Sequence, residues 1–234
     1  MIKSFFVIYY FLFLFYLQLI QGVLLTQAQL ISSRKADTSD EEIIDPVLNL
    51  CIDIFKRLPQ QFDEEAAAEK YPVMYTNSMN TVLRQEMIRF NKLLAYIKSS
   101  LNDTRRAILG QLAMIPELER VHKSMTLGKL PASWASKSYP SLKPLGSYIN
   151  DFLTRLNFLQ KWLEDGEPMV YWLSGFYFTQ SFLTGVLQNH SRKNDLPIDL
   201  LHMKFDVTTI ETEAHERPEM GVYIRVSTVF PSLF

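Results

Sequence analysis

The sequence is poor in the residues that build disulfides, metal sites and phosphate-binding loops. Its 234 residues include a single cysteine, Cys51, and 8 glycines that lie apart from one another. One cysteine excludes an internal disulfide and a cysteine-based zinc site. The pattern GxxxxGK(S/T) does not occur, and neither do GxGxxG, GxSxG, HExxH or DxDxDG. We therefore expect no enzyme activity and no cofactor in this chain.

The sequence also lacks an excess of either charge. Lys and Arg together number 24 and Asp and Glu 25, which leaves a formal net charge of −1. This balance argues against a nucleic-acid partner. The four histidines are scattered. Only His215 and Glu219 have a spacing that a metal site could use, and an exposed loop pair is the simpler interpretation. We expect no metal site.

The first 28 residues differ from the rest of the chain. Phe5–Leu17 is entirely apolar, and small residues at Gly22 and Ala28 offer cleavage sites. This pattern is typical of a secretory signal peptide. A signal anchor and a segment that is not native to the protein remain open as alternatives. Residues 29–42 are polar and are predicted to form a linker.

Helical periodicity begins after this linker. Apolar residues recur every three or four positions in 43–58 and include Cys51, whose thiol we expect to be buried. Asp63 is expected to open a short helix, and Asn77 to cap the longest helix, from about Ser78 to beyond Ser100. The predicted buried stripe of that helix is Met79, Val82, Leu83, Met87, Phe90, Leu93, Leu94, Ile97 and Leu101.

Weaker signals follow in the second half. Pro116 suits the first turn of a helix. Residues 127–146 are rich in Pro and Gly and predict a connection with a turn around Trp134. Ser147 is expected to cap a helix that Gly166 ends. Two strand-like pieces, Leu201–Val207 and Val222–Val226, then interrupt the helical pattern.

The stretch 171–198 reads YWLSGFYFTQSFLTGVLQNHSRKNDLPI. Aromatic residues lie on both sides of Gly175, and an amphipathic helical pattern follows them. The aromatic part predicts a buried hinge, and the pattern after it predicts a helix. Arg192 and Lys193 fall at the end of that helix, where the helix dipole favours cations. They could also contact a partner surface.

The amino-acid sequence of this stretch resembles the C-terminal region of dynein heavy chains. WLSGFYFTQSFLTG, YPVMYTNSMN and YPSLKPLGS carry the resemblance most strongly, within collinear blocks from about Leu48 to Ile224. GFYFTQSFLTG is more similar to axonemal inner-arm chains than to cytoplasmic dynein. The resemblance marks ten residues as a structural or docking signature: Trp172, Ser174, Gly175, Phe176, Phe182, Gly185, Gln188, Asn189, Arg192 and Lys193.

The resemblance implies a mainly α, multi-helix domain with a short antiparallel β part at its C-terminus. It implies that the segment packs on the AAA+ ring of its parent heavy chain and modulates minus-end-directed, microtubule-based movement without hydrolysing ATP. Dynein intermediate and light intermediate chains would be partners at the level of the complex, and the microtubule only indirectly. The implied location is the cytoplasmic cytoskeleton, in particular the cilium axoneme.

Two segments depart from the family pattern. The apolar leader resembles nothing in the family, and the tail RVSTVFPSLF replaces the strands expected there, so we expect a truncated chain with an incomplete β part. The expected organisation is a leader (1–28), a linker (29–42), a helical region (43–198) and a truncated β portion (199–234). The alternative is a secreted or membrane-anchored helical binding protein, which the sequons at Asn102 and Asn189 would suit.

Overall fold

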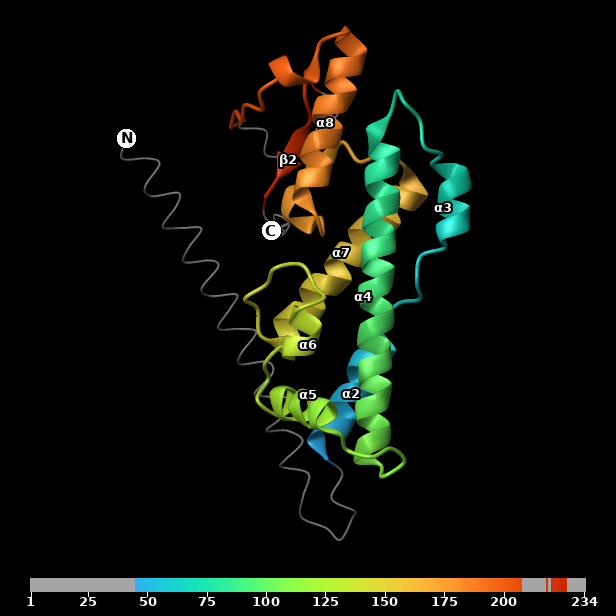
Figure 1. Cartoon of the computed structure of the whole chain (residues 1–234), viewed down its shortest axis with the longest axis vertical. Helices are drawn as coiled ribbons and strands as arrows, with labels where there is room; N and C mark the ends of the chain where they lie inside the picture. Colours follow the sequence, from blue (N-terminus) through green and yellow to red (C-terminus); the bar gives the residue numbers. More distant parts are fainter. Residues whose placement is uncertain (1–44, 208–217, 219, 227–234) are drawn as a thin grey trace, which may run out of the picture. The chain divides into compact units, whose positions relative to one another are not determined.

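The computed structural model describes residues 45–207, 218 and 220–226, and these are mostly helical (Figure 1). The predicted leader and linker, and the pair His215 and Glu219, lie outside the described residues. Within the described residues, no helix has the length and apolar character needed to cross a membrane.

The described residues form two compact units. The first contains residues 45–60 and 93–154, and the second contains residues 61–92 and those from 155 onward. Two long helices, α4 (Ser78–Ile108) and α7 (Leu145–Asp165), therefore contribute one half to each unit.

The first unit is a cluster of helices. Besides the halves of α4 and α7, it contains α2 (Pro46–Arg57), α5 (Pro116–Thr126) and the short α6 (Ala132–Ala135). Helix α2 begins at a proline, which needs no hydrogen-bond partner there, and Asp45 caps it by accepting from the Val47 N–H at 2.8 Å. The same carboxylate lies 2.7 Å from His122 of α5, and α2 packs against α5 (Figure 1).

The core of the first unit combines apolar side chains with satisfied polar ones. Trp134 is fully buried and donates its indole N–H to Ser100 at 2.9 Å. Asp151 is buried and accepts from the Tyr139 hydroxyl at 3.0 Å and from the Lys143 ammonium at 2.6 Å. These bonds supply the partners that buried polar groups require.

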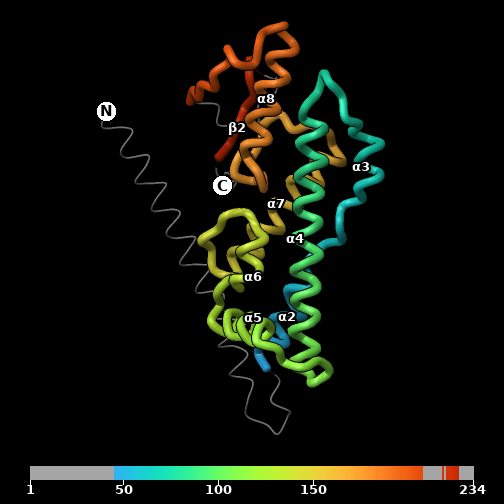
Figure 2. The backbone as a smooth tube through the Cα atoms, in the orientation of Figure 1, coloured from blue at the N-terminus to red at the C-terminus, as the bar shows by residue number. Residues whose placement is uncertain are grey.

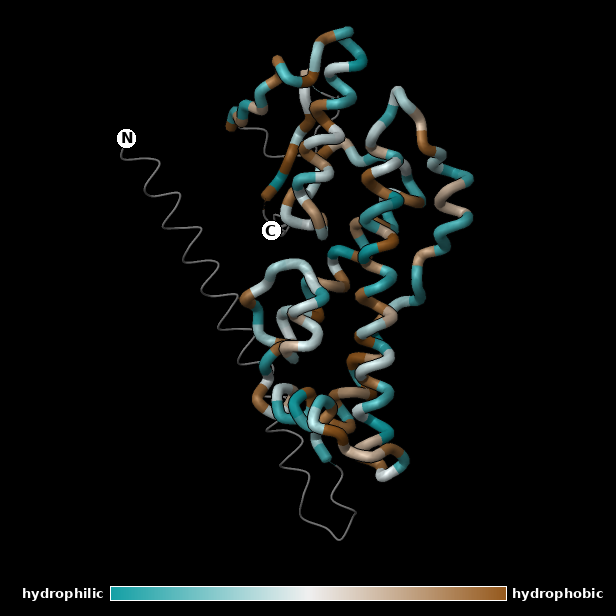
Figure 3. Tube along the Cα trace, in the orientation of Figure 1, coloured by the Kyte–Doolittle hydropathy of each residue, from teal (hydrophilic) through white to brown (hydrophobic). Residues whose placement is uncertain are grey.

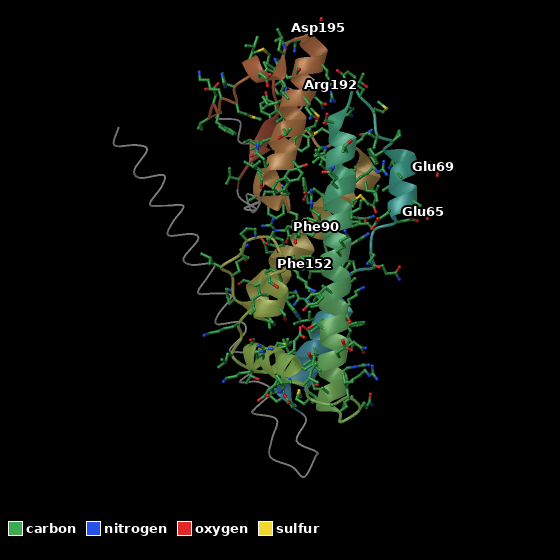
Figure 4. The ribbon with its side chains drawn as sticks, viewed as in Figure 1. Glu65, Glu69, Phe90, Phe152, Arg192 and Asp195 are labelled. Carbon is green, nitrogen blue, oxygen red and sulfur yellow. The ribbon has the colours of Figure 1, made fainter. Side chains whose placement is uncertain are left out.

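The second unit surrounds the N-terminal half of α4. It contains α3 (Glu64–Lys70), the second half of α7, α8 (Thr179–Asn194), the 3₁₀ turns η1 (Leu173–Gly175) and η2 (Ile198–Leu200), and the strands β1 (Val170–Trp172) and β2 (Tyr223–Arg225). Helix α3 exposes an acidic face that includes Glu65 and Glu69 (Figure 4). Asp63 caps this helix with bonds to two N–H groups at 3.0 Å each.

The predicted helices are largely confirmed. All nine residues of the predicted α4 stripe are buried, and Asn77 accepts from the Met79 N–H at 2.9 Å. Figure 3 shows hydrophobic and hydrophilic residues alternating along α4, as expected of a helix with one buried face. The prediction for Ser147 is wrong, because α7 already begins at Leu145 and this serine lies in its first turn.

The prediction for the β part is only partly correct. Tyr223–Arg225 is a strand, but it pairs with Val170–Trp172 in parallel, not antiparallel, with Val170 opposite Tyr223. Residues 201–207 form no strand, and the side chain of Val207 is fully exposed. Strand-like composition does not make a strand unless a neighbouring segment completes its hydrogen bonds.

The single cysteine gives a direct test of the first unit. Cys51 is 1% exposed, and burial raises the pKa of its thiol to about 12. From the thiolate fraction alone, we expect iodoacetamide to label the native protein at pH 8 roughly a thousandfold more slowly than the urea-unfolded protein. Mass spectrometry of timed samples measures both rates. Equal rates would show that Cys51 is not in a packed core.

Candidate functional site

The structure brings most of the predicted signature residues together in the second unit, in three groups. An aromatic cluster surrounds η1, a glycine lies where α8 meets α4, and a polar group lies near the end of α8. The predicted polar residues Gln188, Asn189 and Arg192 all converge on Ser78, the first residue of α4.

Ser78 is the centre of the polar group. Its N–H donates to Asn189 Oδ1 at 2.7 Å, and its hydroxyl donates to Gln188 Oε1 at 2.8 Å. Arg192 Nη1 donates to the same hydroxyl at 2.8 Å and to the carbonyl of Tyr75 at 2.6 Å. The Arg192 guanidinium also lies over the Tyr75 ring, 4.2 Å from its centroid.

These contacts hold the loop before α4 against the end of α8. Figure 2 follows this loop, residues 71–77, from α3 into the start of α4, and Figure 4 labels Arg192 close to the end of α8. Because Asn189 satisfies one of the N–H groups that every helix leaves unpaired at its start, α8 caps α4 from outside. Sequence reasoning missed Tyr75 and Ser78 as partners.

The aromatic group is a core. Trp172, Phe176 and Phe182 are each no more than 2% exposed. Phe176 stacks on Phe182 with ring centroids 4.6 Å apart, and Tyr171 lies 4.8 Å from Phe182. Gly175 is buried beneath the Trp172 ring: a Cβ added there would lie 2.5 Å from Cε3. These signature residues therefore act by packing.

Gly185 sets how closely α8 approaches α4. A Cβ on this glycine would lie 2.7 Å from the Met79 methyl and 3.0 Å from Val82 Cγ2. The two helices run antiparallel, because Ser78 contacts the end of α8 whereas Glu86, two turns later in α4, contacts its beginning.

Glu86 is the residue that sequence reasoning overlooked. It is completely buried, and its carboxylate accepts from the N–H groups of Tyr177 and Phe178, the residues that lead into α8. Arg89 pairs with it at 2.9 Å. A signal was present: Glu86 lies on the apolar stripe between Leu83 and Met87, where a charged side chain needs buried partners.

Burial raises the pKa of the Glu86 carboxyl above its usual value. The N–H groups of Tyr177 and Phe178 and the Arg89 guanidinium oppose this rise by stabilising the ionised form. The arrangement is structural, because the entry to α8 encloses the carboxylate and its bonds are all to neighbouring protein groups.

The remaining two signature residues are exposed. Ser174 donates its hydroxyl to the carbonyl of Val226, and Lys193 follows Arg192 in the last turn of α8. Among the described residues, no three His, Cys, Asp or Glu side chains are placed to hold a metal ion. The site offers positioned donors, aromatic surfaces and an arginine, and groups of these kinds are suited to binding a protein surface.

The profile of the C-terminal domain of the dynein heavy chain matches residues 17–226. The protein belongs to this family. The match begins inside the segment that we expected to be a leader without a family counterpart, so that expectation is wrong for residues 17–28.

Axonemal dynein heavy chains are among the proteins to which this chain is similar. It is 53% identical over 208 residues to dynein axonemal heavy chain 3 of Mus musculus, and 50% over 206 residues to dynein axonemal heavy chain 12 of Homo sapiens. It is 47% identical over 199 residues to dynein axonemal heavy chain 1 of Rattus norvegicus. These alignments cover 89%, 88% and 85% of this chain, but only 5%, 6% and 4% of the relatives.

The two signature glycines of this dynein C-terminal domain should differ in their tolerance of a methyl group. Gly175→Ala forces Cβ against the rigid Trp172 ring and should lower the free energy of unfolding by about 1–3 kcal/mol. Gly185→Ala also approaches Val82 Cγ2 at 3.0 Å, but its shortest contact is with the flexible end of Met79 and it gains helix propensity, so its cost should be smaller. Urea unfolding measures both. A Gly185→Ala cost equal to or above that of Gly175→Ala would contradict this account.

Glu86 should give the domain a specific pH dependence. Below the ordinary carboxyl pKa of 4.5, Glu86 is protonated in both the folded and unfolded states. Between that value and the raised pKa, the folded state retains a proton that the unfolded state has lost, so stability falls as the pH rises. Glu86→Gln cannot titrate and removes this dependence.

We therefore expect the wild type to lose stability relative to Glu86→Gln as the pH rises from about 4.5, by about 1.4 kcal/mol for each unit by which the pKa is raised. Urea unfolding at pH 4 to 8 measures the difference between the two proteins, which cancels the other titrating groups. A difference that stays constant over this range would mean that burial does not perturb Glu86.

Proposed function

We propose that this protein acts as the non-catalytic C-terminal segment of an axonemal dynein heavy chain. In this role it packs on the AAA+ ring of its parent heavy chain and modulates minus-end-directed movement along microtubules. The observation that carries the proposal is the family match over residues 17–226. Sequence identities of 53%, 50% and 47% to three axonemal heavy chains support it.

The described residues support a structural and regulatory role. The polar networks of Glu86 and Ser78 hold helices of the second unit together. The sequence contains no phosphate-binding loop, so ATP hydrolysis belongs to other modules of the motor. Intermediate and light intermediate chains enter the proposal as partners of the whole complex, and microtubule contact as indirect.

A chimeric motor tests this function. The C-terminal region of mouse dynein axonemal heavy chain 3 is replaced by residues 17–226 of this protein, and the control is the same motor with that region deleted. We expect the chimera to keep the microtubule gliding velocity and the ATP turnover of the parent, and the deletion to change both. A chimera that behaves like the deletion would overturn the proposal.

The location of the protein tests the proposal separately. Tagged at its own locus in ciliated cells, the protein should appear in the axoneme and carry no N-linked glycan. Recovery from the medium with glycans on Asn102 or Asn189 would support the secreted alternative. The Asn189 side chain is already engaged with the Ser78 N–H, and Asn102 lies within α4.

A further inference from the structure

A groove in the second unit is not explained by the role of a packing module. It has a volume of about 620 Å³ and lies between the start of α4, the loop before it and α8. Large apolar side chains stand exposed along it: Val73 is 66% exposed, Tyr75 75% and Phe178 51%. Exposed apolar surface of this kind, gathered in one groove, is typical of an interaction site.

The charges that line the groove have one sign. Among the described residues of the lining, Arg89 and Arg192 are charged and none is acidic. The polar lining residues are neutral amides and hydroxyls, such as Gln85, Gln188 and Thr184. A ligand that enters therefore meets cations and hydrogen-bonding groups beside an apolar wall.

The two arginines differ in how far they are neutralised. Arg89 forms an ion pair with the buried Glu86 at 2.9 Å and lies over the Phe178 ring. Arg192 is bonded through Nη1 to two neutral acceptors, and within the described residues no carboxylate pairs with it. Its position is nevertheless fixed by those bonds and by the Tyr75 ring. Its remaining N–H groups match the geometry of a carboxylate.

The size and the apolar wall of the groove favour a ligand larger than a simple anion. A phosphate or acetate ion would satisfy Arg192 but would leave the apolar wall uncovered. A nucleic acid requires a broad basic surface, whereas the described lining of this groove holds two cations and the whole sequence has a net charge of −1. A peptide that carries a carboxylate next to an apolar side chain fits both features.

We propose that this groove binds an acidic peptide segment of a protein partner. A carboxylate of that segment pairs with Arg192, and a neighbouring apolar side chain packs on the exposed side chains of Val73 and Tyr75 at the same end of the groove. The proposal does not depend on the motor function, because it rests on the groove and its charges alone.

Peptide display on the full 234-residue protein tests the proposal. Random dodecapeptides are selected on the immobilised protein, and enriched sequences are synthesised with a fluorescent label for anisotropy titrations. We expect enriched sequences to contain Asp or Glu beside a large apolar residue, with affinity that falls as salt increases. Absence of enrichment, or enriched sequences without acidic residues, would overturn the proposal.

Adjacent basic residues supply a matched control. Arg192→Gln should weaken binding of the acidic peptides by about tenfold or more, since a charge-assisted hydrogen bond is lost. Lys193→Gln removes the same charge one residue away, outside the groove lining, and should change affinity less than about twofold, as expected of an exposed, screened charge that does not contact the peptide. Equal losses in both variants would indicate only a general attraction to the basic helix end.

A third variant distinguishes a loss of peptide binding from a loss of structure caused by replacing Arg192. Val73 is 66% exposed and lines the groove two residues before Tyr75, so Val73→Glu places a negative charge there without removing a hydrogen bond on which the fold depends. We expect it to weaken the same peptides while thermal unfolding stays unchanged. Unaltered binding in this variant would contradict the proposed location. Binding of inorganic phosphate or ATP that depends on Arg192, in the absence of peptide binding, would reassign the groove to small anions.

Discussion

The carboxylate of Glu86 determines how the second unit is arranged. It is buried on the apolar stripe of α4, where an ionised group is unfavourable unless donors surround it. The N–H groups of Tyr177 and Phe178 and the guanidinium of Arg89 provide those donors. Because the two N–H groups belong to the residues that enter α8, satisfying the carboxylate also fixes where this helix starts relative to α4.

A second polar contact at the opposite end completes the alignment of the two helices. Ser78 meets Gln188, Asn189 and Arg192 at the end of α8, and Gly185 permits close approach between the two ends. Apolar packing alone tolerates sliding of one helix along another, whereas directional bonds at both ends select one register. The position of the groove, and of the arginine in it, follows from that register.

The accuracy of the sequence predictions depended on the range of the interactions involved. The buried stripe of α4 and the Asn77 cap were predictable because helical periodicity and capping are local. The parallel pairing of Val170 with Tyr223 was not, because the strands are separated by α8 and no local pattern specifies such a partner. The signature residues of α8 were found by resemblance, yet their shared partner Ser78 lies more than a hundred residues away. Glu86 could have been found locally, as a charge within an apolar stripe.

The fold uses the charge of Arg192 only in part, through the cation–π contact with the Tyr75 ring. Its bonds to the Tyr75 carbonyl and the Ser78 hydroxyl need only an N–H donor, which a neutral amide side chain could also provide. The dipole at the end of α8 favours a cation, but Lys193 already meets that need from the next position. Arg89, by comparison, neutralises a buried carboxylate and is fully accounted for by the fold. A fixed guanidinium that pairs with no carboxylate among the described residues, at the edge of an apolar groove, is therefore positioned for the acidic ligand that we propose.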